Sequence, residues 1–337
     1  MNILLTSVGR RSYIVEYFRQ ALAGAGVVFA ANSELTYAVS QADNHIITPL
    51  IYDPDYIPFL LQYCQDKKIT ALLSLFDVDL AVLAKSRFAF QKIGTRVILA
   101  EDKMIEMCND KWKTHQLAKR LGLMSPATYK SLGGAQRALE CGDLRFPVIL
   151  KPRWGMASIG IYIANNHDEL RVLYAKSNDD AMSGHLKYES SATSSEAILI
   201  QELLFGKEYG LDIVNDLEGN FVAVFAKHKA VMRAGETDIG VTVDPAPFKA
   251  MALSISQEIR HESVLSLDCF RNNAGIFLTE LNCRISGHYP ISHLAGVNVP
   301  MQIIRWLNGK GTDADLLKCE VGVTVIKDLE PRVFKFH

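Results

Sequence analysis

Three groups of residues have the types and the spacing for phosphate and metal chemistry. The first is the segment Lys151–Gly160, where an apolar run ends in a lysine and enters a loop of Gly, Ala and Ser. Glycines let the backbone approach a ligand and turn N–H groups toward anionic oxygens, and the lysine adds a charge for a phosphate. The loop has neither the G-x-x-x-x-G-K-S/T nor the G-x-G-x-x-G pattern. An ordinary hairpin turn is the alternative interpretation.

The second group is the segment Gln201–Tyr209. An apolar strand runs into a short connector that contains Leu203 and Leu204, and Glu208 then opens the next strand. Such a connector can offer backbone C=O and N–H groups to an adenine edge, and a carboxylate placed shortly after it can accept from ribose hydroxyls. Taken alone, the pattern also fits a strand–turn–strand unit with acids that face solvent.

The third group is Asp268 with Glu280, Asn282 and Arg284. Glu280 and Asn282 are two apart on a predicted strand, so they share a face. Asp268 lies on the preceding strand of a hairpin whose predicted turn is 272–275, and cross-strand pairing brings it beside them. Two carboxylates and an amide oxygen form a hard ligand set that suits Mg²⁺ held jointly with phosphates. Apolar flanking residues argue against a solvated hairpin face.

The elements around these groups predict an α/β protein with an α+β carboxyl-terminal part. In the first hundred residues or so, short apolar runs alternate with segments of helical periodicity, which is typical of a parallel sheet wrapped by helices. The predicted strands there are 2–8, 27–31, 46–48, 70–75 and 96–99, and the predicted helices are 12–23, 54–66 and 78–90.

Further along the chain the pattern changes to a mostly antiparallel sheet. The predicted elements are helices 109–121, 133–141, 167–175, 247–261 and 299–308, a strand at 146–151, and strands 197–201, 208–214, 221–227, 240–243 and 275–281. Residues 177–196 are rich in Ser, Asp and Gly and predict a mobile surface segment. We therefore expect domains at 1–105, 106–196 and 197–337, with the glycine-rich loop in the second and the acidic hairpin in the third.

Composition narrows the function classes. The chain has 337 residues, 36 basic and 37 acidic side chains and a net charge of −1, which argues against binding to nucleic acid or a membrane surface. Its six cysteines include no C-x-x-C pair, so a zinc site is not expected. No run approaches the ~18 apolar residues of a membrane span. The start of the chain does not have the pattern of a secretory signal, so we expect a cytoplasmic protein.

The ordered set of the three groups resembles the ATP-grasp superfamily, in particular the short relatives of the carbamoyl-phosphate synthase large subunit. The resemblance covers nearly the whole chain and implies an open parallel α/β domain followed by two lobes that enclose ATP. The residues it implies for nucleotide binding are Lys111, Lys151, Gly155, Ser158, Gly160, Gln201, Glu202, Leu203, Leu204 and Glu208. Those it implies for Mg²⁺, with Mn²⁺ as an alternative metal, are Asp268, Glu280 and Asn282.

The resemblance also implies roles for Arg284 and Lys151 at the transferring phosphoryl group. The sequence departs from the family pattern at Cys283, where the family often has Pro, and at His288, where small residues are common. We favour Arg233 as a further catalytic residue that contacts substrate or the γ-phosphate. Strand alternation would put it on one face with Lys227 and Lys229, and an exposed basic face is the alternative.

Two further sites lie at the predicted carboxyl edge of the parallel sheet, where ligands usually bind. Gly9-Arg10-Arg11 follows the first strand and is a candidate contact for a substrate anion. Asp77 and Asp79 follow the strand that ends at Leu75. Surface charges at helix starts are the alternative interpretation of both.

The resemblance implies a carboxylate–amine ligase with small-molecule substrates, which forms an acyl phosphate from ATP and releases ADP and phosphate. Two alternatives stay open: a phosphotransferase whose product is carbamoyl phosphate or another acyl phosphate, and a nucleotide sensor without catalysis. Dimers are common among such relatives, so a homodimer is the expected assembly.

Overall fold

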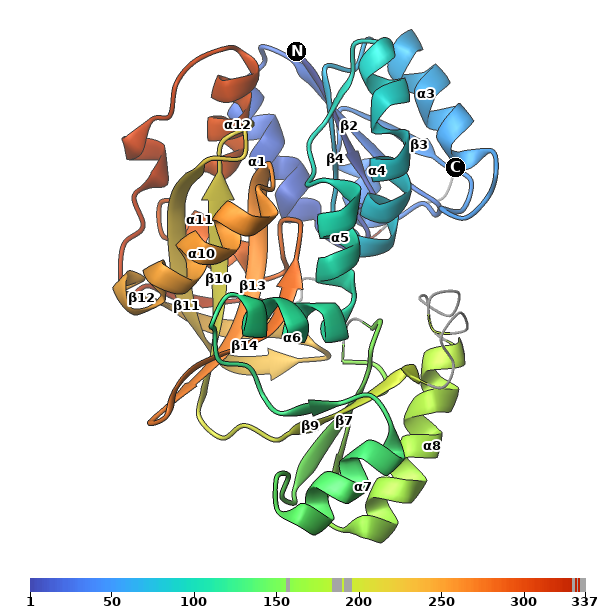
Figure 1. Cartoon of the computed structure of the whole chain (residues 1–337). Coiled ribbons are helices and arrows are strands. Elements are labelled where there is room, and N and C mark those ends of the chain that lie inside the picture. Colours follow the sequence, from blue (N-terminus) through green and yellow to red (C-terminus); the bar gives the residue numbers. More distant parts are fainter. Residues whose placement is uncertain (156–157, 184–189, 191–195, 329–330, 332, 334–337) are drawn as a thin grey trace.

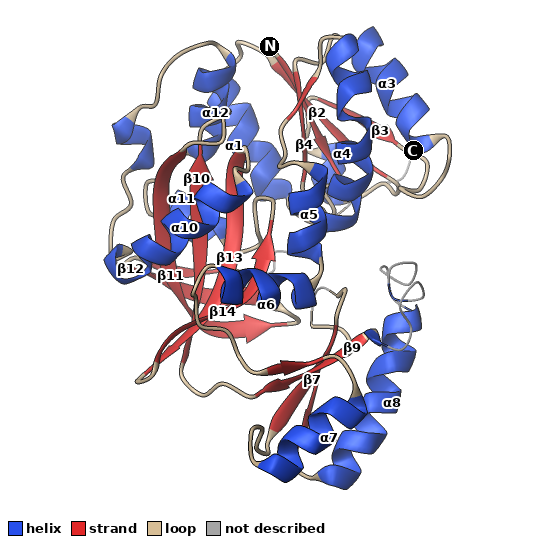
Figure 2. Ribbon diagram, viewed as in Figure 1, coloured by secondary structure: helices blue, strands red, loops and turns tan. Residues whose placement is uncertain are grey.

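The structure is a computed structural model that describes residues 1–155, 158–183, 190, 196–328, 331 and 333. Three sheets organise these residues, as Figure 1 shows: a parallel sheet at the amino terminus, a small sheet at the bottom of the view, and a large antiparallel sheet. Figure 2 shows helices packed beside each of the three.

The amino-terminal sheet has five strands in the order β3-β2-β1-β4-β5, all parallel. Alternate β1 residues face opposite layers: Ile3 and Leu5 pack in one apolar cluster and Leu4 in the other. The predicted open parallel domain is therefore confirmed. Its elements are β1 (Asn2–Thr6), α1 (Ser12–Leu22), β2 (Val27–Asn32), α2 (Tyr37–Ser40), β3 (Asn44–Ile47), α3 (Tyr56–Asp66), β4 (Ala71–Ser74), α4 (Asp77–Lys92) and β5 (Arg96–Val97).

Two helices, α5 (Asp102–Asn109) and α6 (Lys111–Arg120), replace the single helix predicted at 109–121. The chain breaks at Asp110, whose backbone is extended. The Asp110 carboxylate accepts from the backbone N–H groups of Trp112 (3.0 Å) and Lys113 (3.3 Å). A side-chain cap of this kind begins a new helix, so Lys111 lies at the first position of α6.

The small sheet has the order β6-β9-β7-β8 and carries helices α7 (Leu132–Cys141) and α8 (His167–Ser183). Its strands are β6 (Thr128–Tyr129), β7 (Val148–Pro152), β8 (Tyr162–Ala164) and β9 (Ile198–Glu202). Because α8 continues to Ser183, the surface segment predicted from residue 177 is wrong over 177–183. Most of its remainder, 184–189 and 191–195, lies outside the described residues. The domain boundary predicted after residue 196 falls just before β9, which pairs with β7 in this sheet.

The large sheet has six strands in the order β14-β13-β10-β11-β12-β15, and every neighbouring pair is antiparallel, as predicted. Its strands are β10 (Lys207–Asn215), β11 (Phe221–Arg233), β12 (Glu236–Val243), β13 (Ser263–Asn272), β14 (Gly275–Asn282) and β15 (Thr324–Ile326). The helices of this part are η2 (Ala246–Phe248), α10 (Lys249–Ile259), α11 (Tyr289–Leu294), α12 (Val299–Leu307) and η3 (Ala314–Leu317). Helix α11 and strand β15 were not predicted.

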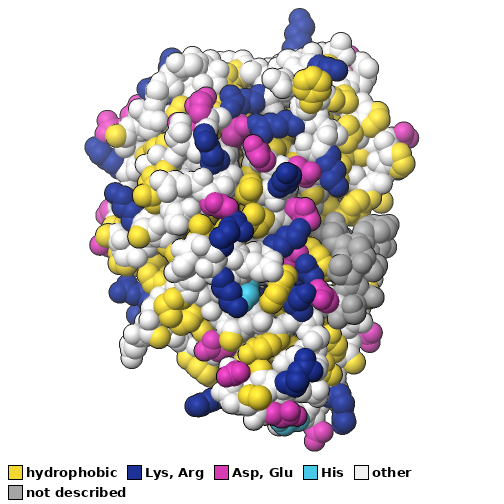
Figure 3. Space-filling model, viewed as in Figure 1, with side chains coloured by type: hydrophobic (Ala, Val, Ile, Leu, Met, Phe, Trp, Pro, Cys, Tyr) yellow, Lys and Arg dark blue, Asp and Glu magenta, His cyan; other side chains and the backbone are white. Residues whose placement is uncertain are grey.

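Surface chemistry agrees with the balanced composition. On the face drawn in Figure 3, basic and acidic side chains are interspersed and do not separate into patches of one sign. Over the described part of the chain, none of the helices combines the length and the apolar character that crossing a membrane requires.

Candidate functional site

The acidic hairpin has the register that the sequence predicts. Asp268 on β13 lies opposite Glu280 on β14, Ser266 lies opposite Asn282, and the strands turn between Asn272 and Gly275. The register shifts just after Asp268, where the Thr279 hydroxyl donates to the Asp268 carbonyl oxygen (2.9 Å). Opposed residues in an antiparallel pair point to the same side. The structure therefore brings the three predicted metal ligands to one face of the hairpin.

A lysine contacts each of the two hairpin carboxylates. Lys229 on β11 is hydrogen-bonded to Glu208 and lies 3.2 Å from Asp268 Oδ1, while Lys111 Nζ lies 3.3 Å from Glu280 Oε1. Burial opposes ionisation of Asp268, but the charge and hydrogen bond of Lys229, together with His288 and Lys227, outweigh it and hold the pKa of that carboxyl below its usual range. In Glu208 burial prevails, and its pKa is raised.

The two predicted phosphate lysines, Lys111 and Lys151, come from different elements and meet beside the glycine-rich loop. Lys111 Nζ donates to the Gly155 carbonyl oxygen (2.6 Å), and Lys151 lies on β7 just before that loop. Burial, reinforced by the charge of Lys111, lowers the pKa of Lys151 to about 8. The repulsion between the two lysines makes this a favourable place for phosphate oxygens, although the Glu280 carboxylate already lies beside Lys111.

Asp110 fixes this arrangement. Its carboxylate accepts from Arg153 Nε (2.8 Å) and Nη2 (2.7 Å), and the Lys111 N–H donates to the Arg153 carbonyl oxygen (3.1 Å). A two-pronged arginine–carboxylate contact of this kind is strong and directional. The sequence pattern alone did not indicate the roles of Asp110 and Arg153, which depend on a contact between two elements 43 residues apart.

The glycine-rich loop joins β7 to β8, which are antiparallel neighbours, so it is the turn of a hairpin as well as a candidate phosphate loop. Gly160 has a φ of +73°, and a Cβ there would meet Pro152 Cγ at 2.8 Å. Its carbonyl oxygen accepts from the Ser177 hydroxyl (2.6 Å). Ser158 also has a positive φ, 58°. Residues 156–157 of the loop lie outside the described residues.

The predicted adenine connector links β9 to β10. Gln201 is buried and its amide donates to the Thr128 hydroxyl (2.7 Å), whereas the exposed Glu202 accepts from the Ala127 N–H (3.3 Å). Leu203 and Leu204 lie between the strands and are half-buried. Their backbone groups are thus outside the strand pairing of either sheet, as a backbone-reading connector requires.

Arg284 joins the large sheet to the amino-terminal domain. Its Nε and Nη2 atoms lie 2.8 Å and 2.6 Å from Asp77 Oδ2, at the start of α4. Burial opposes the charge of Arg284, but the attraction of Asp77 raises the pKa of the guanidinium. Asp77 and Arg284 are far apart in the sequence, so the sequence pattern did not indicate this contact. The neighbouring Asp79 has a structural role, because it accepts from the hydroxyls of Thr6, Ser7, Tyr56 and Ser74.

A second cluster of polar side chains lies behind the hairpin and is fully buried. Lys227 and His288 were noted from the sequence, whereas Asp212 and Ser292 were not. Lys227 bonds Asp212, and the Ser292 hydroxyl lies 2.8 Å from Lys227 Nζ and 2.7 Å from Asp212 Oδ2. His288 lies between them and the acidic hairpin: its Nδ1 is 3.4 Å from Asp212 Oδ1 and its Nε2 is 2.8 Å from Ser266 Oγ. The only sequence signal for Asp212 was an acidic residue within an apolar strand.

The basic residues of β11 do not form one face. Lys227 and Lys229 are buried, so the exposed basic face considered as an alternative is wrong for both. Bulges after Lys229 and Val231 break the strand alternation that would have aligned them with Arg233. Arg233 lies at the exposed end of β11, where it bonds Asp238 and donates to the Lys327 carbonyl oxygen (3.1 Å). The structure does not bring it to the hairpin acids.

The donor set fits a hard cation such as Mg²⁺. Asp268 Oδ1 is buried and is contacted by the Lys229 ammonium group at 3.2 Å, and the Glu280 carboxylate and the Asn282 amide on the same hairpin face add oxygen ligands. Within the described ranges, no three or more His, Cys, Asp or Glu side chains are grouped so as to hold a metal by themselves. The predicted set of two carboxylates and one amide therefore needs further oxygens, which substrate phosphates or water supply in Mg²⁺ sites.

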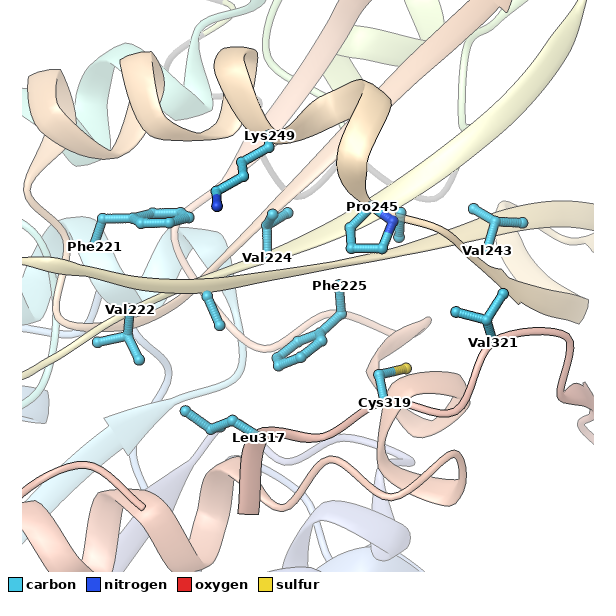
Figure 4. A pocket seen from close by; sticks show the side chains of 12 residues that line it. Phe221, Val222, Val224, Phe225, Val243, Pro245, Lys249, Leu317, Cys319 and Val321 are labelled. Carbon is cyan, nitrogen blue, oxygen red and sulfur yellow. The ribbon is translucent and has the colours of Figure 1, made fainter. Parts of the chain in front are cut away.

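An apolar pocket of about 320 Å³ lies elsewhere on the large sheet, along the Phe221–Ala226 part of β11 (Figure 4). Lys249 is the charged side chain in its lining, which otherwise consists of apolar residues and Cys319. The lining includes none of the residues predicted for chemistry, so the pocket does not alter the assignment of the site.

Comparisons with known proteins match the two halves of this architecture. A model described as PylC-like, N-terminal domain, matches residues 3–98, and an ATP-grasp domain model matches residues 144–250. The arginine-specific carbamoyl phosphate synthase large chain of Bacillus subtilis is 21% identical over 308 residues, which are 88% of this chain and 27% of that protein. The carbamoyl phosphate synthase large chain of Thermotoga maritima is 27% identical over 234 residues, which are 67% of this chain and 20% of that protein. The chain thus spans about a quarter of the length of these curated relatives.

Solved structures agree on the fold. The biotin carboxylase domain of Hydrogenobacter thermophilus 2-oxoglutarate carboxylase, a dimer in complex with MgADP and bicarbonate, has a TM-score of 0.73 at 18% identity and covers 96% of this chain and 73% of that one. The L-amino acid ligase from Bacillus licheniformis has a TM-score of 0.72 at 14% identity, with 96% and 79% covered. With the strand order and the two domain matches, these findings confirm the predicted ATP-grasp fold, and the chain is similar to the carbamoyl phosphate synthase large chain.

Proposed function

We propose that this protein is a Mg²⁺- and ATP-dependent carboxylate–amine ligase that activates a carboxylate as an acyl phosphate, passes the acyl group to an amine, and releases ADP and phosphate. One observation carries the proposal: Lys111 and Lys151 converge beside a glycine-rich loop, directly across from the Asp268–Glu280 pair. Cations for phosphates and oxygens for a metal thus meet in one place, which is the arrangement that phosphoryl transfer requires.

Each side chain then has a specific task. Lys111 and Lys151 would hold phosphate oxygens, and Gly155, Ser158 and Gly160 would close over them and exclude water. Gln201, Glu202 and the Leu203–Leu204 connector would bind adenine, and Glu208 the ribose. These tasks position the reactants and do not require a covalent enzyme intermediate.

Asp268, Glu280 and Asn282 would hold Mg²⁺, which when bound would offset charge on the phosphates. For this to happen Glu280 must leave Lys111 and Asp268 must leave Lys229, so the two lysines become free for phosphate and ribose-side contacts at the same moment. Arg284 would stabilise the transferring phosphoryl oxygens. Arg233 would contribute only by leaving Asp238, which makes its catalytic role the least direct of the set.

The alternative activity is an acyl-phosphate-forming phosphotransferase, and the resemblance to carbamoyl phosphate synthase large chains favours it as much as the L-amino acid ligase structure favours ligation. Product analysis separates the two, because ligation consumes an amine and yields an amide. We also propose a homodimer, the assembly of the Hydrogenobacter thermophilus domain, which light scattering tests directly.

The test is ADP release from MgATP in the presence of pooled amino acids and carboxylates, followed by mass spectrometry of the products. Glu280→Ala should lower turnover by more than the ~10- to 100-fold that loss of an indirect metal partner costs. The fold should survive, because Glu280 is 30% exposed and Lys111 keeps its bond to Gly155. Glu258→Ala, at a surface ion pair with Arg120, is the matched control. Near-normal turnover of Glu280→Ala would contradict the assignment.

Nucleotide binding has its own measurement. MgATP should raise the melting temperature, since a ligand at 100 times its Kd stabilises the folded state by about 2.7 kcal/mol. Absence of a shift at millimolar MgATP would remove the basis for the whole proposal, whatever the substrates are. Replacing Mg²⁺ with Mn²⁺ in the same experiment tests the alternative metal.

A further inference from the structure

A second charged cluster lies at the carboxyl edge of the parallel sheet, on the other side of Arg284 from the hairpin. Arg11 directly precedes α1, and its Nη1 donates to the Leu75 carbonyl oxygen (2.6 Å) just beyond β4. Asp77 begins α4 two residues later and binds Arg284. In open α/β sheets, ligands bind at this edge. The two arginines therefore approach one place from two different domains.

The cluster leaves two buried polar atoms without partners. Arg11 Nε, a donor, and Asp77 Oδ1, an acceptor, are both shielded from water and have no hydrogen bond. Leaving a buried polar group without a partner is costly, so an unpaired donor and an unpaired acceptor in one cluster point to a missing ligand. The ligand has to accept at one end and donate at the other.

Charge supports the same conclusion. Burial and the nearby positive charge of Arg284 both lower the pKa of Arg11. Asp77 is already bound by Arg284, and the other acid near Arg11, Glu236, is half exposed and lies 3.2 Å from Lys327 Nζ. Neither acid therefore forms an ion pair with Arg11, and of the two Asp77 oxygens only Oδ2 is occupied, by Arg284. An additional anion between Arg11 and Arg284 would relieve their repulsion.

We propose that Arg11, Asp77 and Arg284 bind the carboxylate substrate and that this substrate is an amino acid. Its carboxylate accepts from Arg11 Nε and from the remaining N–H groups of Arg284, and its ammonium group donates to Asp77 Oδ1. This inference rests on the proposed ligase function. It assigns Arg11 as a substrate-binding residue, so that the carboxylate lies next to the arginine proposed to act on the transferring phosphoryl group.

The pair of unpaired atoms favours an amino acid over a plain carboxylate or a simple amine. A plain carboxylate would satisfy Arg11 but leave Asp77 Oδ1 unpaired, and a simple amine would do the reverse. An amino acid supplies both groups within one small molecule. The expected preference is therefore for free amino acids over the same molecules with the amine blocked, because a site whose buried polar group is left unpaired rejects the incomplete ligand strongly.

The experiment uses the full chain saturated with MgADP, so that the phosphate lysines are occupied. The twenty standard amino acids are added one at a time, and stabilisation is followed by thermal shift and calorimetry. At least one amino acid should bind, and its N-acetyl derivative should bind about 10-fold more weakly or worse. If none of the twenty stabilises the MgADP complex, the proposal is overturned.

Two variants locate the contacts. Arg11→Gln should raise the Kd of the bound amino acid by about 10-fold or more while the shift caused by MgADP alone is retained, which shows that the fold and the nucleotide site survive. Asp77→Asn should reduce the discrimination between the amino acid and its N-acetyl form. Arg19→Gln is the matched control, because Arg19 lies on α1 but is exposed and pairs with Glu16 and Asp43.

The outcomes separate this proposal from the ligase proposal. Amino acid binding that depends on Arg11, without ADP release from MgATP, keeps the subsite and contradicts the ligase function. ADP release with an unchanged KM for the amino acid in Arg11→Gln keeps the ligase function and overturns the subsite.

Discussion

Lys227 and Lys229 are two residues apart on β11, and each pairs with acids from neighbouring strands, yet their surroundings differ completely. The side chains of Lys227 and Asp212 are both 0% exposed, and the Ser292 hydroxyl completes their contacts. Lys229 is 5% exposed, but its partners Glu208 and Asp268 are 26% and 19% exposed. The first pair is sealed from ligands, and the second can exchange partners.

The difference teaches that access, more than residue type, decides what a buried lysine does. In the Lys227–Asp212 pair, the attraction between the two charges offsets the cost of burying them. Removing one partner would leave the other charge unpaired in the interior. In the open pair, water, a metal ion or a sugar hydroxyl can take the place of the ammonium group. We therefore expect the two lysines to divide the roles of stability and activity between them.

The largest expected effect is on stability. Lys227→Met leaves the Asp212 carboxylate buried without its cation, and it should lower the free energy of unfolding by about 3–5 kcal/mol. Urea denaturation measures the change. The double variant Lys227→Met/Asp212→Leu should recover most of the loss, because it removes both charges. A double variant as unstable as the single one would show that packing, not charge, dominates here.

Lys229→Met should have the opposite profile. Its partners can reach water, so the stability loss should be clearly smaller than that of Lys227→Met. ADP release should fall by about 10- to 100-fold in kcat/KM, because Glu208 and Asp268 lose the ammonium group that offsets their mutual repulsion and favours their ionised forms. The proposed difference between the two lysines would be wrong if Lys227→Met and Lys229→Met lowered the free energy of unfolding equally and Lys229→Met kept its activity.

A smaller effect should appear in the pH dependence, through Lys151. Its pKa is about 8 in the ligand-free fold, below the ordinary 10.5. Between these values the unfolded chain binds more protons, so the contribution of Lys151 to stability rises with pH across that window. Below pH 8 the full cost of the buried charge is present. Phosphates favour the charged form, so MgADP binding at pH 8.5 should take up protons.

Calorimetry in two buffers with different ionisation enthalpies measures that proton uptake. Lys151→Met should bind MgADP more weakly and with less uptake. The affinity of the unmodified protein should decline as the pH rises above 8, because the proton must then be supplied on binding. Identical uptake in both proteins would assign the titration to another group.

The smallest effect is expected for Arg233, the third basic residue of the strand. It is exposed and paired with Asp238, so Arg233→Ala should change the free energy of unfolding by less than about 1 kcal/mol. Its predicted contact with substrate or the γ-phosphate would make ADP release fall as well. Steady-state turnover identical to that of the unmodified protein would end that prediction.

Local patterns predicted the parts of the site that depend on short sequence separations. The Asn272–Gly275 turn fixes the hairpin register, and with it the pairing of Asp268 and Glu280. The alternation of strands and helices likewise predicts the parallel sheet. The start of the surface segment was predicted too early, because residues 177–183 are mostly polar and yet continue α8.

Contacts between segments that are distant in the sequence could not be predicted from local sequence patterns. Asp77 and Arg284 are 207 residues apart, and nothing in either local pattern indicates the other. The same holds for Asp212 and Ser292, and for the different fates of Lys227 and Lys229. These depend on which strands become neighbours in the large sheet and on which face α11 covers, and both follow from the complete fold.

The carboxylate of Asp110 has a mechanical consequence. It caps α6, which packs on β14 of the large sheet, and it also grips Arg153, at the end of β7 in the small sheet. The two sheets are thus fastened to each other at one spot beside the phosphate lysines. If the small sheet moves relative to the large one, we expect Lys111 and Lys151 to keep a nearly constant separation, because the Asp110–Arg153 contact lies close to both lysines in the chain.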